Sequence, residues 1–335
     1  MIISKTPYRV SLFGGGTDYP DYVRTHGGEF LGFAINKYCY ISLRKLPPFF
    51  EYKSRLVWSE VELVKEFSEI KHPAIRAILE EHCPYKGIEL HHDGDLPART
   101  GMGSSSSFTV GLLNAFWALM GDQASKHYLA KEAIRIEQDV LKENVGCQDQ
   151  VWAAYGGFNH VSFAMDGSFE VNPVVMKEDR RREFQESLML VFTGFSRFSS
   201  EIASEQVRNI HVNERHLRQM RVLVSDALTI LRGTGPLDAI GRLLHESWRL
   251  KRELAENITS DYIDLIYEAA RSAGAIGGKL LGAGGGGFML LFVPPDRQES
   301  VRKRLDSLIH VPFQMAMEGS RIALYEPGGL DGAEW

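Results

Sequence analysis

Residues Pro97–Phe108 read PARTGMGSSSSF, and this stretch decides how the rest of the chain is interpreted. Gly101 and Gly103 lie on either side of Met102, four serines follow, and an apolar run with helical i, i+4 spacing begins at Phe108. The serines are therefore predicted to lie at a helix start, where unpaired N–H groups and the helix dipole attract anions. Because glycine has no Cβ, the backbone there can approach a ligand closely. The stretch predicts a phosphate-binding loop, and the alternative is a Ser/Gly linker that runs into a capped helix.

Length and composition are those of an ordinary soluble globular protein. The 335 residues exceed one typical hydrophobic core and predict two domains. The apolar content of 44% and charged content of 24% are average, and the net charge of −5 argues against nucleic acid or an anionic membrane as a partner. We expect no transmembrane span and no signal peptide. Three cysteines without a CxxC pair are typical of a reducing cytoplasm.

The N-terminal segment is predicted to be a strand that ends at three consecutive glycines, Gly14–Gly16. Thr17 and Asp18 follow, so a hydroxyl and a carboxylate stand on a flexible turn. Asp18 could accept hydrogen bonds from two sugar hydroxyls, and a purely turn-forming role is equally open. Arg9 lies upstream on the same strand, where a role in the site and an ion pair at a strand edge both agree with the sequence.

Glu137 is predicted to be a buried carboxylate. It lies on a helix predicted over about Ser125–Glu143. At about 100° per residue, Glu137 falls between Val140 and Leu141, inside the apolar stripe of that helix. A carboxylate in such a place is costly unless it is paired or bound to a metal. We favour a metal ligand, and an Arg or Lys partner from a neighbouring element is the alternative.

Asp149 lies between two glutamines in GCQDQ, ahead of a short helix predicted over Val151–Tyr155. Taken alone, Asp149 is equally well explained as a helix N-cap. Together with a phosphate loop and a buried glutamate in the same domain, the role of catalytic base is favoured. Cys147 is less suited as a nucleophile, because no histidine lies nearby in the sequence to activate it.

The remaining segments outline a second domain. The residue pattern changes near residue 180, which predicts domains of residues 1–180 and 181–335. The first would contain a long strand or strand pair over Gly28–Leu46 and a charged helical segment over Ser59–Cys83. The second would contain a strand at Leu188–Gly194, Arg197 on the following loop, and helices over Ser199–Arg232, Leu237–Asn257, Ser260–Ala273 and Asp296–Ile309.

Residues Gly274–Val293, GAIGGKLLGAGGGGFMLLFV, are predicted to form two strands joined by a loop at Gly282–Gly287. Four consecutive glycines leave the backbone bare, so packing against a partner or a ligand is favoured over a loose hairpin. The loop is not a dinucleotide fingerprint, because a strand and not a helix follows it.

The three glycine-rich segments, in this order, resemble the motifs of the GHMP kinases. PYRVSLFGGGTDYP resembles the N-terminal substrate motif, PARTGMGSSSS the phosphate-loop motif with Met102 in place of Leu, and KLLGAGGGGF the C-terminal motif. The resemblance extends from position 7 to position 288, nearly the whole chain. It implies an α+β fold with an N-terminal, ribosomal-protein-like α/β domain that contains a left-handed βαβ unit, and a ferredoxin-like C-terminal domain.

The resemblance also implies an ATP-dependent kinase that binds ATP and Mg²⁺ between its domains. Asp149 would be the base toward the acceptor hydroxyl, with Arg9 beside it to stabilise the transferring phosphoryl group. The ATP phosphates would be bound by Pro97, Gly101, Met102, Gly103, Ser104, Ser105, Ser106 and Ser107, and Mg²⁺ by Ser104 and Glu137. The substrate would be bound by Gly15, Gly16, Thr17, Asp18, Gly284, Gly285, Gly286 and Arg197.

Within the family, the GGGTD, GxQDQ and TGxSR segments look most like those of the bacterial heptose kinases. These enzymes phosphorylate the anomeric hydroxyl of D-glycero-D-manno-heptose 7-phosphate for GDP-heptose and surface polysaccharide synthesis. Galactokinases carry Glu-His-Thr-Asp where this chain has Gly15 to Asp18, which disfavours galactose. The alternatives are a kinase for another sugar, such as fucose, galactose or mannose, and a non-catalytic sugar sensor. We expect a cytoplasmic enzyme with a small-molecule sugar substrate, and the sequence leaves a homodimer open.

Overall fold

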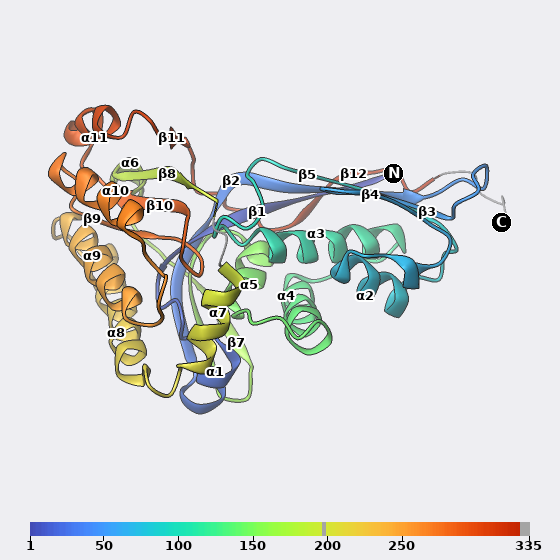
Figure 1. The fold of residues 1–335 in the computed structure, drawn as a ribbon, viewed down its shortest axis with the longest axis horizontal. Helices are drawn as coiled ribbons and strands as arrows, with labels where there is room; N and C mark the ends of the chain where they lie inside the picture. The colour runs from blue at the N-terminus through green and yellow to red at the C-terminus, as the bar shows by residue number, and fades with distance from the viewer. Residues whose placement is uncertain (196–198, 329–335) are drawn as a thin grey trace.

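The computed structural model describes residues 1–195 and 199–328. The described residues form two β-sheets, one with eight strands and one with four. In Figure 1 the small sheet lies on the left with helices outside it, and the large sheet extends to the right with helices beneath it. This mixed, two-sheet organisation confirms the fold class predicted from the sequence.

The first sheet has the order β12-β1-β2-β5-β3-β4, and β6 and β7 branch from β2. Its neighbouring strands are antiparallel, except that β3 and β5 run parallel with α2 in their connection. α3 packs against β1 and β2 (Figure 1). The strands are β1 (Ile2–Phe13), β2 (Gly28–Lys45), β3 (Ser54–Val57), β4 (Val61–Val64), β5 (Ile88–Gly94), β6 (Phe158–Phe163), β7 (Phe169–Pro173) and β12 (Arg321–Tyr325), and the helices are α1 (Pro20–His26), α2 (Pro73–His82), α3 (Ser104–Leu119), α4 (Lys126–Arg135) and α5 (Gln148–Tyr155).

The second sheet has the order β11-β8-β10-β9, and each neighbouring pair is antiparallel. The chain forms it as strand, helices, strand, strand, helix, strand, which is the βαββαβ order of a ferredoxin-like domain. α9 packs on β9 and β10, and α8 contacts both α9 and the first sheet. The strands are β8 (Leu188–Gly194), β9 (Gly277–Leu280), β10 (Gly287–Phe292) and β11 (Ile309–His310), and the helices are α6 (Glu178–Glu186), α7 (Ser199–Arg208), α8 (Glu214–Arg232), α9 (Asp238–Arg252), α10 (Asp261–Ser272) and α11 (Gln298–Arg304).

β2 is one continuous strand of 18 residues and not a strand pair, and it pairs with β1, β5 and β6. Its glycine at position 32 makes room for α5, because a Cβ on Gly32 would lie 2.7 Å from the Trp152 ring. Trp152 is fully buried there and packs on Phe30, with 5.0 Å between the ring centroids. This contact fixes α5, the helix that carries Asp149 in its first turn.

The segment predicted as helical over Ser59–Cys83 is a helix only in its second half. β4 and a 3-10 turn (Phe67–Glu69) come first, and α2 begins at Pro73. In β4 the apolar first and third residues are exposed, whereas Glu62 is buried and accepts a hydrogen bond from Trp58 Nε1 at 2.9 Å. The prediction was wrong for the first half because this edge strand buries the charged Glu62 beside Val64 and exposes Val61 and Leu63, so its sequence lacks the usual strand alternation.

Other predicted helices are shorter or divided. The helix predicted over Ser125–Glu143 begins where expected, and Ser125 is its N-cap, since Ser125 Oγ accepts a hydrogen bond from the Tyr128 N–H at 3.1 Å. α4 then passes into a π-helical turn at Ile136–Val140, which contains Glu137. Such turns are frequent at functional sites. The stretch predicted as one helix over Ser199–Arg232 is divided into α7 and α8.

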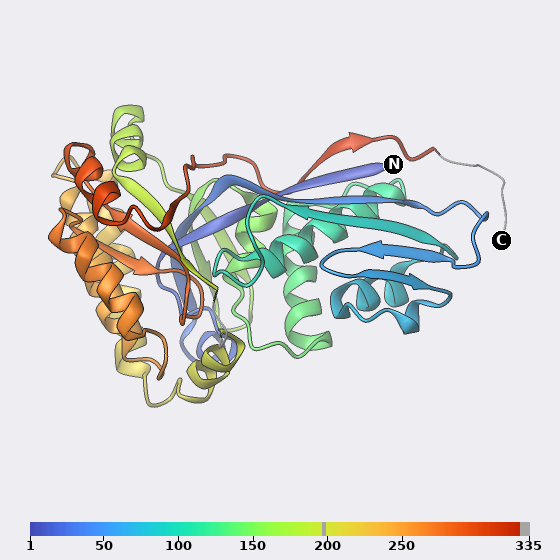
Figure 2. The ribbon, with the colours of Figure 1, turned by 45° about the horizontal axis from the view of Figure 1, so that its top comes forward.

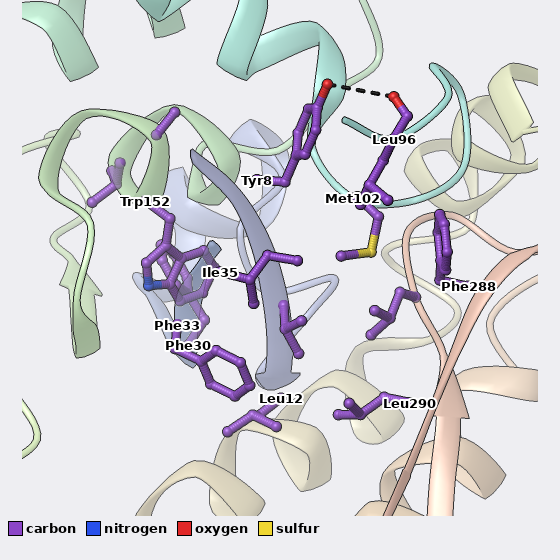
Figure 3. Packing of buried hydrophobic residues seen from close by; sticks show 14 of the residues in the cluster. Tyr8, Leu12, Phe30, Phe33, Ile35, Leu96, Met102, Trp152, Phe288 and Leu290 are labelled. Carbon is purple, nitrogen blue, oxygen red and sulfur yellow. Dashed lines mark hydrogen bonds between the residues drawn. The ribbon is translucent and has the colours of Figure 1, made fainter. Parts of the chain in front are cut away.

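The phosphate-binding stretch lies at the seam between the two sheets. Met102 is fully buried, and Figure 3 shows its side chain between the core around β1 and Phe288 of β10. The Phe288 N–H donates to the Thr100 carbonyl at 3.2 Å. Gly101 has φ +81° and a Cβ on it would lie 2.5 Å from the Leu281 carbonyl oxygen, so only glycine allows this approach. The C-terminal glycine-rich segment therefore packs directly on the phosphate-binding stretch.

The chain returns to the first sheet at its C-terminal end. β12 pairs with β1 in antiparallel register, and Figure 2 shows it beside the N-terminus. The division at residue 180 stays a proposal, and a strand from beyond that point completes the first sheet. Among the described helices, none has both the length and the apolar character needed to cross a lipid bilayer.

Candidate active site

The start of α3 has the geometry of an anion-binding helix N-terminus. Its N-cap, Gly103, has φ +73° and provides no side-chain cap. The first intrahelical hydrogen bond runs from the Ser107 N–H to the Gly103 carbonyl at 2.9 Å. The N–H groups of the three preceding serines thus point out of the helix end. A Cβ on Gly103 would lie 3.2 Å from Asp149 Oδ2, so this helix end adjoins the Asp149 carboxylate.

The side chains of the predicted phosphate-binding stretch have different surroundings. Pro97 and Ser105 are exposed, Ser104 is half-buried and Met102 lies in the core. Arg99 was not predicted for the site, yet it is exposed in this stretch and has the left-handed φ of +61°, which is strained for a non-glycine residue. The serine hydroxyls differ as follows: Ser104 Oγ accepts from the Arg99 N–H at 3.3 Å, Ser106 Oγ donates to Glu137 Oε2 at 2.8 Å, and Ser107 Oγ donates to the Pro7 carbonyl at 2.9 Å.

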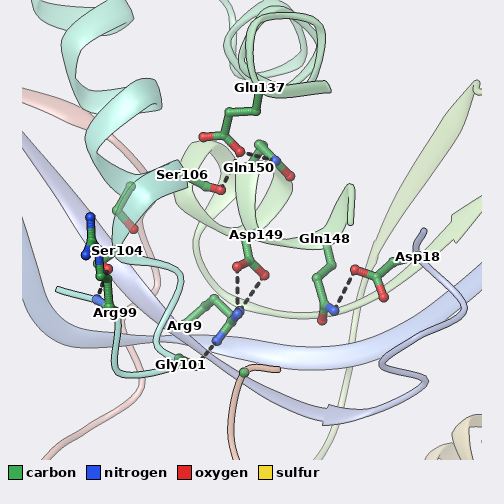
Figure 4. A network of polar contacts seen from close by, with 12 residues as sticks. Arg9, Asp18, Arg99, Gly101, Ser104, Ser106, Glu137, Gln148, Asp149 and Gln150 are labelled. Atoms are coloured by element: carbon green, nitrogen blue, oxygen red, sulfur yellow. Dashed lines mark hydrogen bonds and ion pairs between the residues drawn. The ribbon is translucent and has the colours of Figure 1, made fainter. Parts of the chain in front are cut away.

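Arg9 and Asp149 form a bidentate ion pair (Figure 4). Arg9 Nε donates to Oδ1 and Nη2 donates to Oδ2, each at 2.6 Å, while Nη1 donates to the Gly101 carbonyl at 2.6 Å. The Arg9 side chain is 6% exposed and that of Asp149 is 23% exposed, so the carboxylate is the partner that remains accessible. Asp149 does not cap α5, because the N-cap residue is Cys147. The Arg9 guanidinium therefore links the phosphate-binding stretch to the first turn of α5.

Glu137 is buried, with only 1% of its surface exposed, as its helical position predicts. Ser106 and Gln150 donate hydrogen bonds to Oε2, whereas Oε1 is buried without a partner in the described structure. Burial raises the pKa of Glu137 to about 7. No Arg or Lys pairs with it among the described residues, so the salt-bridge alternative is not found there. An orphaned carboxylate oxygen beside the phosphate-binding helix fits a cation ligand.

Asp18 is buried at the end of the N-terminal glycine turn. Its Oδ1 accepts from the Gly16 N–H at 2.8 Å, and its Oδ2 accepts from Gln148 Nε2 at 2.7 Å. Burial, and then the nearby Asp149 carboxylate, raise the pKa of Asp18. A Cβ on Gly146, in the loop before α5, would lie 1.8 Å from Asp18 Oδ2. This loop can therefore pass Asp18 only with glycine at position 146. Asp18 thus has the turn contact foreseen as an alternative and also lies within electrostatic reach of Asp149.

Of the other predicted substrate residues, only some lie near Asp18 and Asp149. Thr17 Oγ1 donates to the Gly14 carbonyl at 2.7 Å and so stabilises the turn. Gly284 packs on Ile258, and the Gly285 N–H donates to the Ile258 carbonyl at 2.9 Å. Two other glycines of this segment meet the phosphate-binding stretch: a Cβ on Gly282 would lie 2.3 Å from Gly101 Cα, and a Cβ on Gly287 would lie 2.3 Å from the Thr100 carbonyl oxygen. Arg197 lies outside the described residues.

Cys147 has no reactive environment. Its thiol is buried and donates to the Asp18 carbonyl at 3.1 Å, and burial raises its pKa well above the ordinary value. A low thiol pKa and access to solvent are what a nucleophilic cysteine requires. The structure therefore agrees with the expectation that Cys147 is not the nucleophile.

Three polar residues near the site were not predicted from the sequence. Gln148 bonds to Asp18 and points toward it in Figure 4. Lys279 of β9 and Lys251 of α9 reach the same region from the second domain, and both are buried. A lysine within the otherwise apolar strand GGKLL is a signal that could have identified Lys279. The position of Lys251 depends on the packing of α9 and has no such local signal.

Comparisons with known proteins identify the family. Residues 63–157 match the GHMP kinases N terminal domain and residues 228–310 match GHMP kinases C terminal. A mevalonate kinase of Pyrococcus horikoshii is 31% identical over 74% of this chain and 72% of that protein. The chain belongs to the GHMP kinases. As a GHMP kinase it is an ATP-dependent phosphotransferase with an alcohol-group acceptor.

Two further comparisons cover nearly the whole of this GHMP kinase. The D-glycero-alpha-D-manno-heptose 7-phosphate kinase of Campylobacter jejuni is 29% identical over 91% of this chain and 93% of that protein. The crystal structure of a D-glycero-D-manno-heptose 1-phosphate kinase from Bacteroides thetaiotaomicron superimposes with a TM-score of 0.79 at 24% identity, covering 97% of this chain and 100% of that chain. The structural similarity confirms the two-domain GHMP kinase fold.

Proposed function

We propose that this GHMP kinase transfers the γ-phosphoryl group of ATP to the anomeric hydroxyl of D-glycero-D-manno-heptose 7-phosphate. The Arg9–Asp149 pair carries the proposal, because it adjoins both the start of α3 and the buried carboxylate of Asp18. The name and the full-length match of the Campylobacter jejuni relative support this acceptor. The product would supply GDP-heptose for surface polysaccharide, in the cytoplasm.

In this proposal Asp149 takes the proton from the acceptor hydroxyl as its oxygen attacks phosphorus. Its partly exposed carboxylate is held in one orientation by the two hydrogen bonds from Arg9. The Arg9 guanidinium stabilises the negative charge that spreads over the phosphoryl oxygens, and the N–H groups at the start of α3 bind the phosphates. Positioning and charge neutralisation are most of what phosphoryl transfer needs from a protein.

The residues present fit a Mg²⁺ ion. Glu137 Oε1 is a buried oxygen without a partner in the described structure, and the Ser104 hydroxyl lies two residues before the serine that bonds to Oε2 of this carboxylate. We propose that Glu137 and Ser104 hold the ion, with Ser106 and Gln150 orienting the carboxylate. When bound, Mg²⁺ supplies positive charge to the ATP phosphates.

The sugar would lie against the N-terminal glycine turn. Asp18 can accept hydrogen bonds from its hydroxyls, and Gly15 and Gly16 leave the backbone open to it. Two further polar atoms, Ser11 Oγ and Gln148 Oε1, are buried without partners in the described structure. Both side chains lie next to Gly15, where a Cβ would be 3.7 Å from Ser11 Oγ and 4.0 Å from Gln148 Nε2. These atoms are available to a bound polyol. For the acceptor phosphate, the proposed ligand is Arg197 or Lys37.

The experiment is an ATP-consumption screen with Mg²⁺ over heptose 7-phosphate, mannose, fucose, galactose and mevalonate. We expect turnover with heptose 7-phosphate to exceed that with each other acceptor. Asp149→Asn should lower kcat by about 100-fold or more, since general bases contribute about 10²–10⁴ to rate, and should leave ATP affinity within about threefold. Activity on free galactose alone would refute the heptose assignment. Retained turnover with lost ATP affinity in Asp149→Asn would reverse the role of Asp149.

A further inference from the structure

Two lysines of the second domain are buried at the seam with the first. Lys279 is 3% exposed in the middle of β9, and Lys251 is 6% exposed near the end of α9. Lysine is almost never this deeply buried unless it is paired, because an ammonium group loses its hydration there. Neither lysine forms an ion pair with a carboxylate in the part of the chain that the structure describes.

The ammonium groups of these lysines have more N–H donors than their hydrogen bonds use. Lys279 Nζ donates to the Leu12 carbonyl of β1 at 3.0 Å, and an ammonium group has three N–H donors. Lys251 Nζ donates to the Leu280 carbonyl at 2.8 Å and to the Gly282 carbonyl at 2.6 Å. These carbonyls belong to the segment that follows Lys279 in the sequence. Lys251 thus fixes the turn at the end of β9, while Lys279 reaches β1 with N–H donors that no hydrogen bond among the described residues uses.

Contacts join these lysines to the region of Arg9. Lys251 bonds to the carbonyl of Gly282, which packs on Gly101, and the Gly101 carbonyl accepts a hydrogen bond from Arg9 Nη1. Arg9 and Asp18 are electrostatic neighbours of Lys279, and Arg9 and Lys279 are those of Lys251. Burial, and then the Arg9 charge, lower the pKa of Lys279 to about 8. Two buried cations of the second domain therefore lie near Arg9, the ion-pair partner of Asp149, and one of them, Lys279, also has Asp18 as a charged neighbour.

We propose that Lys279 donates hydrogen bonds to the transferring phosphoryl group, and that Lys251 is a positioning residue for Lys279 and the Gly282 turn. The proposal rests on the phosphoryl transfer described above and adds a cation from the second domain to it. In that step the acceptor oxygen forms a bond to the γ-phosphorus, the bond from phosphorus to the β–γ bridging oxygen breaks, and ADP leaves with the electron pair. Asp149 receives the hydroxyl proton, and Lys279 remains an ammonium throughout.

The positions of Arg9 and Lys279 make the proposed site depend on contact between the two domains. The charge of the transferring group spreads over three equatorial oxygens, and cations in a dry site stabilise it most. Arg9 comes from the first domain and Lys279 from the second, so both are present only when the domains are packed together. The rival explanation is that Lys279 merely ties β9 to β1 through the Leu12 carbonyl.

The test compares Lys279→Met, Lys279→Arg and Lys251→Met with wild type and with Lys303→Met, an exposed control. The first readout is kcat with KM for ATP and for the acceptor. The second is ADP affinity with and without beryllium fluoride, which occupies the γ-phosphoryl position and needs no acceptor. Affinity for ADP alone also reports whether each variant is folded at the seam.

We expect Lys279→Met to lower kcat 100-fold or more and to keep ADP affinity within threefold of wild type. The factor by which beryllium fluoride raises ADP affinity should fall at least tenfold in this variant. Lys279→Arg should regain part of both, Lys251→Met should lose less than Lys279→Met, and Lys303→Met should match wild type. Full tightening with kcat within threefold in Lys279→Met would overturn the proposal. If Lys279→Met does not bind ADP, Lys279→Arg decides: partial loss of tightening with ADP affinity kept supports the proposal, and full tightening with wild-type kcat overturns it. A wild type that tightens on ADP but phosphorylates none of the sugars refutes only the proposed acceptor.

Discussion

Replacement of Glu137 by glutamine is expected to stabilise the nucleotide-free protein at alkaline pH. Burial raises the pKa of Glu137 from 4.5 to about 7, and the Glu143 carboxylate adds to this rise. Glutamine has nearly the same shape, and its Oε1 can accept the hydrogen bonds that Ser106 and Gln150 now donate to the carboxylate. The substitution therefore removes a buried charge at little cost in packing.

The size of the effect follows from the two pKa values. Because the pKa is higher in the folded state, the folded protein binds more protons between pH 4.5 and 7, and wild-type stability falls as the pH rises through this interval. The difference, at about 1.36 kcal/mol per pH unit, amounts to roughly 3 kcal/mol. With an unfolding entropy of about 2.1 cal/mol/K per residue, this corresponds to about 4 °C in Tm for 335 residues.

Calorimetry between pH 5 and pH 8.5, with EDTA and without nucleotide, checks this. The Tm advantage of Glu137→Gln over wild type should be small at pH 5 and grow to about 4 °C above pH 7. Glu170→Gln, which alters an exposed carboxylate on β7, should follow the wild-type profile. Mg²⁺ with ATP should then stabilise wild type more than Glu137→Gln. A difference in Tm that does not change with pH would refute the buried-charge reasoning, and an unchanged Mg²⁺ dependence would refute the metal role.

Three other substitutions test neighbouring parts of the site. Gly101→Ala should lower the free energy of unfolding in urea by more than about 1 kcal/mol and weaken ATP binding, because φ is +81° and the new Cβ would meet the Leu281 carbonyl. Gly235→Ala is the control, because a Cβ there meets open space, and it should change neither quantity. Ser106→Ala should cost about 1 kcal/mol and raise the Mg²⁺ concentration needed for half-maximal rate, since Glu137 loses a donor. Asp18→Asn should raise KM for the acceptor at least tenfold and leave KM for ATP within threefold, and an equal rise in both would contradict a sugar-binding role.

The parts of the fold that sequence could predict are those governed by local pattern. The helix start at Ser104, the helix start near Ser125 and the burial of Glu137 were predicted from the pattern of each helix, and the structure confirms each. The hairpin around Gly282–Gly287 follows likewise from apolar runs on both sides of the glycines. The metal, base and sugar roles assigned to these positions stay predictions.

The parts that sequence could not predict depend on contacts between distant segments. Nothing near Lys279 or Lys251 indicates that both meet Arg9, because their positions depend on how the second domain packs on β1. The shared metal role predicted for Ser104 and Glu137 stays a proposal, and the sequence did not predict that the hydroxyl bonded to this carboxylate belongs to Ser106, one half-turn further along α3. A spacing of two residues changes the face of a helix, and only the packing of α3 against the π-helical turn decides which face meets Glu137.

The pairing of β12 with β1 bears on how the protein is made. During translation β1 leaves the ribosome before β12, its neighbour on one side, and all the other described strands emerge between them. A nascent or prematurely terminated chain therefore presents an unpaired edge at β1, which is a template for association with other chains. Growth conditions that slow elongation, or stop codons ahead of Arg321, are thus expected to convert this enzyme into insoluble material while its nucleotide-binding stretch is already complete.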